Sequence, residues 1–186
     1  MIRLIAEAYL GLTASLQALT FRKGWQERLD VSLTGFWHSF LAIIPSTALV
    51  ALIFIAIGHA GYQPPSLGTW ISYGLSWLIF PGAAAVATIV LGVRQSFVPW
   101  VILHNWGVVW LYAFLALMWM LLTAGLINRE FLEFVLFLYL YFRVLVHWRI
   151  AYVTLGLPTI TSALAAAVPI VTAEIGQLLV RQAFGS

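Results

Sequence analysis

Arg143 and His147 are the residues of this 186-residue chain whose types and spacing most suggest chemistry. They lie four positions apart inside the apolar run Phe131–Leu155, so in a helix they share one face. A guanidinium within hydrocarbon costs at least ~2.5 kcal/mol, and an ionisable residue in a membrane span is a candidate functional group. The rest of the chain must therefore supply Arg143 with a partner.

The amino-acid composition indicates that these residues are surrounded by lipid and not by water. The chain is 63% hydrophobic and 8% charged, whereas a soluble domain is about 25% charged. Lipid admits only helix bundles and closed barrels, and the apolar runs here are longer than the alternating ~10-residue strands of a barrel. We therefore predict an all-α integral membrane bundle.

Five apolar segments are long enough to cross a hydrocarbon core of about 30 Å. Proline is expected to kink the first of them at Pro45 and the fifth at Pro169. The small residues AAAVA in the second are expected to form a helix-packing face. The predicted spans are Gly35–His59, Thr69–Val93, Val98–Leu122, Phe131–Leu155 and Thr159–Val180.

Residues 1–30 form a separate predicted region, and residues 31–186 form the five-helix transmembrane domain. In Met1–Thr20, apolar residues recur at helical spacing, which predicts an amphipathic helix that lies in the membrane surface or packs on the bundle. The connector that follows carries three basic residues beside Trp25, as expected for a cytoplasmic interface. These residues are Arg22, Lys23 and Arg28.

Charge predicts the orientation. With the N-terminus inside, six basic residues fall on the cytoplasmic side and only Arg129 and Arg181 fall outside, which agrees with the positive-inside rule. Five spans then place the C-terminus outside. Arginine outnumbers lysine eight to one and alanine is abundant, a composition associated with GC-rich bacterial genomes, so the predicted location is a bacterial cytoplasmic (inner) membrane.

The polar residues of different spans are expected to meet in the cytoplasmic half of the bundle. At ~1.5 Å per residue, His104 lies roughly 9 Å from the cytoplasmic start of its span, Arg143 roughly 12–18 Å and His147 roughly 6–12 Å from the end of theirs. Asn105 and His38 lie at similar or shallower levels. The sequence therefore predicts a polar cluster of these five residues.

Four interpretations of the cluster remain open. It is a structural network in which Arg143 bonds to helix-end carbonyls or Asn105, a site for a lipid headgroup or other anion, part of a proton or solute path, or a haem site with His104 and His147 as axial ligands. Glu174, a candidate intramembrane acid, is expected nearer the outer face. Arg143 reaches it only if a tilt or a kink at Pro169 brings the helices together.

Other chemistry is largely missing from the sequence. There is no phosphate-binding loop, no His-Glu-x-x-His pair and no Gly-x-Ser-x-Gly elbow, and the absence of cysteine excludes disulfides and thiolate sites. We therefore expect no catalytic residues, no metal site, no cofactor and no nucleic-acid partner.

The layout of the chain resembles that of the Yip-type proteins, the Rab-GTPase-interacting membrane family with small bacterial relatives of unknown function. The resemblance rests on an N-terminal segment before five closely spaced spans, on DVSLTGFWHSF at 30–40, on HNW at 104–106 and on WRIAYVTLG at 148–156. It implies a non-enzymatic membrane role in organisation, trafficking or accessory binding.

The function expected from the sequence is that of a structural or accessory membrane subunit that binds lipid. Other integral membrane proteins or further copies of the chain are its other expected partners. The first alternative is a small oligomeric transporter or channel that uses Arg143, His147 and Glu174. The second is a haem-binding anchor of a redox complex.

Overall fold

The computed structural model describes residues 2–63 and 66–184, and all regular structure within them is helical. The side chains of Arg3 and Arg181 lie outside the described part. The α-helices are α1 (Ile2–Leu19), α2 (Leu33–Ser39), α3 (Ile43–His59), α4 (Leu67–Val90), α5 (Phe97–Thr123), α6 (Arg129–Leu155), α7 (Thr159–Ala165) and α8 (Ala167–Phe184). Short 3-10 turns cover Gln26–Arg28, Phe40–Ala42 and Arg94–Ser96.

Within the described residues, five helical segments are long and apolar enough to cross a membrane, as the sequence predicts. Their limits lie within a few residues of the predicted ones, apart from a 3-10 turn that extends the third segment at its start. The segments are Leu33–His59, Leu67–Val90, Arg94–Thr123, Arg129–Leu155 and Thr159–Val180.

The first and fifth segments are broken, but not at the prolines themselves. The first passes through the 3-10 turn Phe40–Ala42 before α3 begins, and the fifth is interrupted at Ala166, between α7 and α8. In each case the proline, Pro45 or Pro169, occupies the first turn of the helix that follows. A proline has no N–H to donate to the carbonyl four residues earlier, so the disruption falls on the preceding turn.

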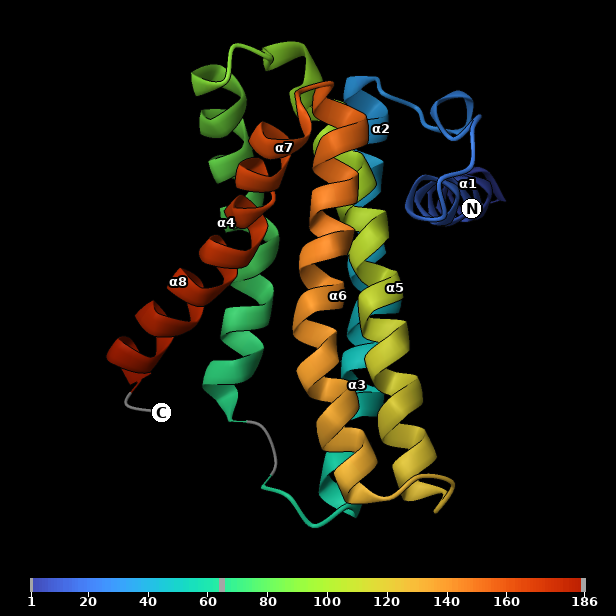
Figure 1. Cartoon of the computed structure of the whole chain (residues 1–186), viewed down its shortest axis with the longest axis vertical. Helices are drawn as coiled ribbons and strands as arrows, with labels where there is room; N and C mark the ends of the chain where they lie inside the picture. Colours follow the sequence, from blue (N-terminus) through green and yellow to red (C-terminus); the bar gives the residue numbers. More distant parts are fainter. Residues whose placement is uncertain (1, 64–65, 185–186) are drawn as a thin grey trace.

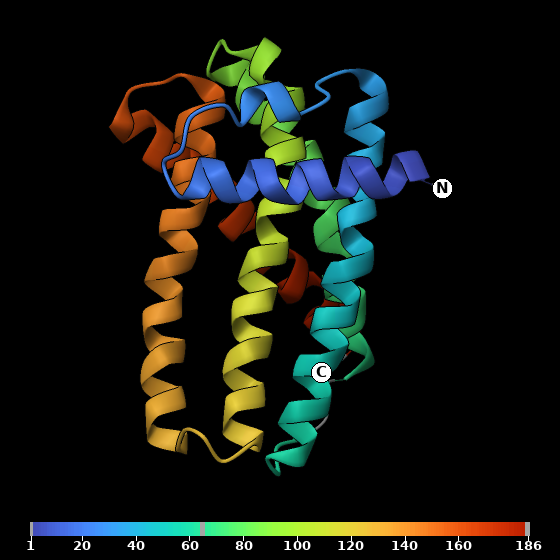
Figure 2. The ribbon, with the colours of Figure 1, turned by 90° about the vertical axis from the view of Figure 1, so that its right-hand side faces the viewer.

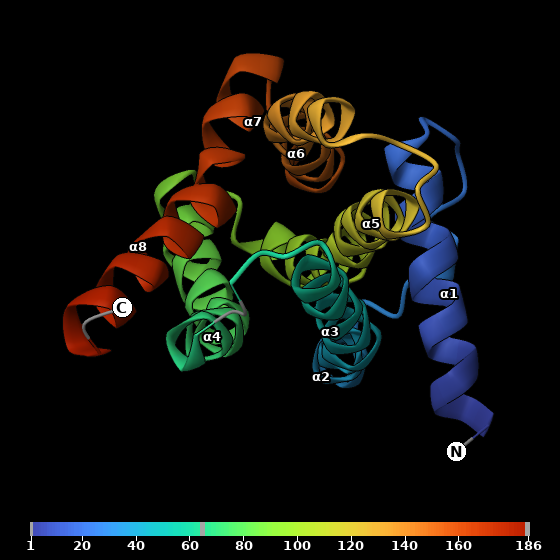
Figure 3. The ribbon, with the colours of Figure 1, turned by 90° about the horizontal axis from the view of Figure 1, so that it is seen from below.

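The long helices run between two ends of the bundle (Figure 1). The turns 91–96 and 156–158 and the start of α2 lie at one end, called here the α6–α7 end. The turns 60–63 and 124–128 lie at the other, the α5–α6 end. α8 leaves the α6–α7 end obliquely and packs along α4. The view along the bundle shows α4 and α8 on one side and α3, α5 and α6 on the other (Figure 3).

Local signals fix where these helices start and stop. Ser32, Ser66 and Asn128 each accept a hydrogen bond from a backbone N–H in the first turn of α2, α4 and α6, which satisfies a donor that the helix leaves unpaired. Gly156 ends α6 with φ of 64°, a left-handed conformation that glycine adopts without a Cβ penalty.

Helix α1 lies across α5 and α6 instead of running parallel to them (Figure 2). It packs through small residues, since Gly11, Ala14 and Ala18 are buried, whereas Ile5 and Tyr9 are about two-thirds exposed. The packed face therefore includes only part of the stripe of large apolar residues that marks the sequence pattern. Small residues let α1 approach the bundle closely; Leu12 and Leu19 pack beside them, and Ile5 and Tyr9 remain on the outer side.

The connector between α1 and α2 is more firmly packed than its charges suggest. The sequence places Trp25 at the headgroup level, but its side chain is 6% exposed and belongs to the main hydrophobic cluster. Arg22, Lys23 and Arg28 are exposed around it. The indole thus anchors the connector to the bundle, and the basic residues surround that anchor.

Candidate functional site

His104 of α5 and His147 of α6 lie in direct contact. Their imidazole rings stack with centroids 5.2 Å apart and planes 19° apart, and Phe80 of α4 stacks on the other face of His104 at 3.7 Å. His104 is 9% and His147 4% exposed. The structure thus stacks two of the five residues of the predicted cluster, a third, Asn105, lines the adjoining cavity, and Phe80 is an aromatic partner that the sequence did not suggest.

A cavity of about 70 Å³ adjoins the two histidines. It lies between α4, α5, α6 and α8, and its polar wall comes from Ser76, Asn105, Tyr112 and Thr172 in addition to the histidines. Nδ1 of each histidine is buried without a hydrogen-bond partner among the described residues. Buried polar groups are nearly always hydrogen-bonded, so these imidazoles are unusual.

Asn105 hydrogen-bonds to α2 and not to Arg143, contrary to one of the structural interpretations of the cluster. Its side-chain amide donates to Ser39 Oγ of α2 at 2.9 Å, and Ser39 in turn donates to the carbonyl of Phe36 at 2.7 Å. Both Asn105 and Ser39 are almost fully buried. This amide therefore ties α5 to α2, a role set by the tertiary arrangement.

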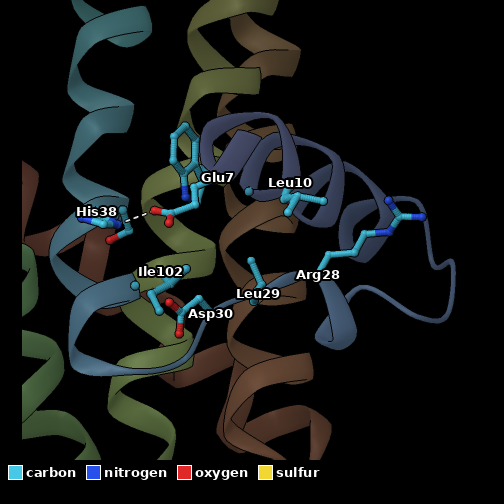
Figure 4. A pocket seen from close by; sticks show the side chains of 11 residues that line it. Glu7, Leu10, Arg28, Leu29, Asp30, His38 and Ile102 are labelled. Carbon is cyan, nitrogen blue, oxygen red and sulfur yellow. Dashed lines mark hydrogen bonds and ion pairs between the residues drawn. The ribbon is translucent and has the colours of Figure 1, made fainter. Parts of the chain in front are cut away.

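His38 belongs to a second polar site, on the side of α2 that faces α1. Its Nδ1 pairs with a carboxylate oxygen of Glu7 (Figure 4). A cavity of about 60 Å³ lies here, and Arg28, Asp30 and Ser39 contribute to its wall. The sequence analysis placed Glu7 off the apolar face of its helix but did not predict a partner for it.

Arg143 forms an ion pair with Glu174 of α8, in which Nη1 lies 3.8 Å from Oε1. From the sequence we expected this contact only if a tilt or a kink brought the helices together. Both are present: the fifth segment is interrupted at Ala166, and α8 runs obliquely across the bundle (Figure 1). Arg143 is 24% and Glu174 60% exposed at the side chain. The pair therefore lies at the margin of the bundle, outside the histidine cavity.

We expect Arg143 and Glu174 to be coupled in stability. In the apolar environment predicted from the sequence, Glu174→Leu leaves the guanidinium without its counter-ion, and Arg143→Leu leaves the carboxylate without its own; the double change Arg143→Leu/Glu174→Leu removes both charges. Each single variant should therefore lose more unfolding free energy in mixed micelles than the double variant does. Additive losses would show that the two side chains do not interact.

An apolar groove lies where α1 crosses α5 and α6. It has a volume of about 550 Å³ and is lined chiefly by large apolar side chains, among them Trp110, Phe114, Phe142 and Leu145. Arg149 and Phe21 stand at one end of it. Volumes of roughly 300–1,000 Å³ are typical of sites for small molecules.

Arg149 is held in place by α1 and the connector. Its Nε donates to the carbonyl of Ala18 at 2.8 Å, and its guanidinium carbon lies 4.2 Å from the centroid of the Phe21 ring. An Arg has five N–H donors in a planar fork, so one bond to α1 orients the group without exhausting it. The sequence analysis used this residue only to predict the orientation, because Ala18 and Phe21 lie more than a hundred residues away from it in the chain.

The histidine pair does not fit a haem as axial ligands. A metal–nitrogen bond lies in the plane of the imidazole, so two axial rings point at the iron end-on, whereas His104 and His147 face each other and are in contact. The adjoining space of about 70 Å³ is also far below the roughly 300 Å³ at which small-molecule sites begin.

The five residues of the predicted cluster thus make four different sets of contacts. His104 and His147 stack beside the cavity, Asn105 lines it and bonds to Ser39 of α2, His38 pairs with Glu7 of α1, and Arg143 pairs with Glu174 of α8. Comparison with protein-family models, with curated proteins and with solved structures finds no match to the chain.

Proposed function

We propose that this chain is a non-enzymatic, multi-pass protein of a bacterial cytoplasmic membrane that binds an anionic phospholipid between α1, α5 and α6. The observation that carries the proposal is the apolar groove with Arg149 at one end. It supports the accessory, lipid-binding role expected from the sequence, and we assign that role to this groove. The Yip-type relationship remains a prediction.

The shape of the groove supports an acyl chain as the occupant. Its lining follows α6 from Arg149 to Phe142, a rise of roughly 10 Å along the helix axis. Most of that lining is apolar, and Thr20 and Arg149 are the polar members near one end. An acyl chain along the groove places its phosphate at this end, beside the guanidinium, and Arg recognises phosphate through paired N–H groups.

The position of Arg149 supports the cytoplasmic leaflet as the source. Arg22, Lys23, Arg28 and Arg94 are exposed in the connector and at the α6–α7 end, the end toward which Arg149 lies. Anionic lipids are enriched at the cytoplasmic surface and attract basic segments. In this orientation α1 lies in the interface, with Ile5 and Tyr9 turned outward to lipid, as interfacial helices are arranged.

We expect the lipid to be lost when the groove is filled. In Ala113→Leu the larger side chain occupies the groove, and in Arg149→Gln the phosphate loses a cation, which costs ~1 kcal/mol or roughly fivefold in affinity. Native mass spectrometry after exchange into vesicles containing phosphatidylglycerol should show a retained lipid on the wild type and less on both variants. Ala124→Leu, at the exposed C-cap of the same helix, and Arg129→Gln, at the α5–α6 end, are the controls. Equal retention in all proteins would contradict the proposal.

The proposed orientation predicts two active reporter fusions. Alkaline phosphatase is active only outside the cytoplasm, so fusions at Gln63 and at the C-terminus should both be active, while a fusion after Arg94 should be inactive. An inactive C-terminal fusion beside an active fusion at Gln63 would mean an even number of spans. Activity after Arg94 alone would mean that the orientation is reversed.

A further inference from the structure

The imidazole rings of His104 and His147, which line one cavity, have no hydrogen-bond partner in the described part of the protein. Neither imidazole makes a hydrogen bond to another described residue, and Nδ1 of both is buried. A neutral imidazole has one donor and one acceptor. Two such rings more than nine-tenths buried therefore leave two donors and two acceptors without protein partners.

The residues that line the cavity indicate the charge of the ligand that it can bind. The residues that line it include no Asp, Glu, Lys or Arg; on α6, Arg143 pairs with Glu174 and Arg149 bonds to the carbonyl of Ala18. A cation finds no carboxylate in this wall, and an anion finds no ammonium or guanidinium. The lining thus matches a neutral ligand that both donates and accepts hydrogen bonds.

The size of the cavity limits the ligand further. A water needs about 10–15 Å³ of such volume and two to four polar partners, and the cavity offers about 70 Å³. Ser76 and Thr172 give their own hydroxyl protons to helix carbonyls, so their oxygens remain acceptors on the wall. Tyr112 adds a further hydroxyl to the wall.

We infer that the cavity between α4, α5, α6 and α8 is a binding site for a cluster of water molecules, hydrogen-bonded to His104 and His147. The site is independent of the lipid groove, which lies between α1, α5 and α6 and shares no lining residue with it. It makes the pair of histidines a hydrated group inside the predicted membrane-spanning bundle.

The test is water-edited solid-state NMR of the wild-type protein in lipid bilayers. Magnetisation from water should reach the imidazoles of His104 and His147 much faster than it reaches the methyl groups of Ile150, which is 0% exposed on the same helix as His147. Build-up at the histidines no faster than at Ile150 would overturn the inference. Because this comparison uses only the native protein, it decides the question even if a variant fails to fold.

A cavity-filling variant provides the second measurement. In Ala173→Leu the new side chain occupies the cavity but leaves both histidines in place, so the water signal at the imidazoles should be lost. Ala167→Leu adds the same side chain at an exposed site on the same helix and should leave the signal unchanged. Persistence of the signal in folded Ala173→Leu would contradict a cluster bound in this cavity. Lipid retention by Ala173→Leu should remain normal, which separates this inference from the proposed function.

Discussion

Replacing Gly11 by Leu should detach α1 from the bundle. A Cβ at this position would collide with the indole ring of Trp106, whose side chain is 4% exposed and held in the core. The ring cannot move without disturbing its neighbours, so α1 must move. Overpacking of this kind costs ~1–3 kcal/mol, which is roughly a 5- to 150-fold shift in the docking equilibrium.

Because the chain has no cysteine, the labelling of a single introduced cysteine can report whether α1 is docked. A single cysteine introduced by Ala14→Cys occupies a position that is 0% exposed in the docked helix, so it should react slowly with a maleimide. Adding Gly11→Leu should raise that reaction rate. Gly74→Leu is the matched control, because a Cβ on Gly74 of α4 meets nothing within 4 Å. No change in reactivity with Gly11→Leu would mean that α1 is not held at this contact.

The docking of α1 also bears on the lipid site. Residues Leu16, Leu19 and Phe21 form one wall of the groove, and Trp110 Nε1 donates to Ser15 Oγ at 3.1 Å to fix that wall to α5. Gly11→Leu should therefore lower lipid retention as well. Retention that survives detachment of α1 would place the lipid elsewhere.

Trp100→Ala should be the most destabilising single substitution that we propose. Trp100 is 1% exposed in α5, and its ring packs edge-on against Phe80, with the ring centroids 5.7 Å apart. Its loss leaves a cavity in the main hydrophobic cluster, and truncation of a buried aromatic residue costs ~3–5 kcal/mol. The unfolding free energy in mixed micelles should fall by about this amount.

Trp37→Ala is the control for Trp100→Ala. Trp37 is 62% exposed on α2, so its removal should have only a small effect on the free energy of unfolding. Comparable losses in the two variants would mean that packing around Trp100 is not the source of the effect. Phe80 also stacks on His104, so Trp100→Ala tests whether the histidine pair depends on this aromatic wall.

The sequence by itself determined the number, length and approximate limits of the apolar helices. The apolar runs that define these helices are local signals, and each acts within a few residues of its position. The equal depth of His104 and His147 also followed from helical rise alone. For that reason the five segments and the proximity of these two histidines could be expected before the structure was known.

Only the tertiary structure decided which polar groups meet. Helical rise gives the depth of a residue but not the direction in which its side chain points or the tilt of its helix, so residues at one level can still face different neighbours. Asn105 bonds to Ser39, and Arg143 reaches Glu174 because α8 is oblique. Glu7 and Arg149 gained roles from the crossing of α1 over α5 and α6, a contact between segments far apart in the chain that no periodicity records.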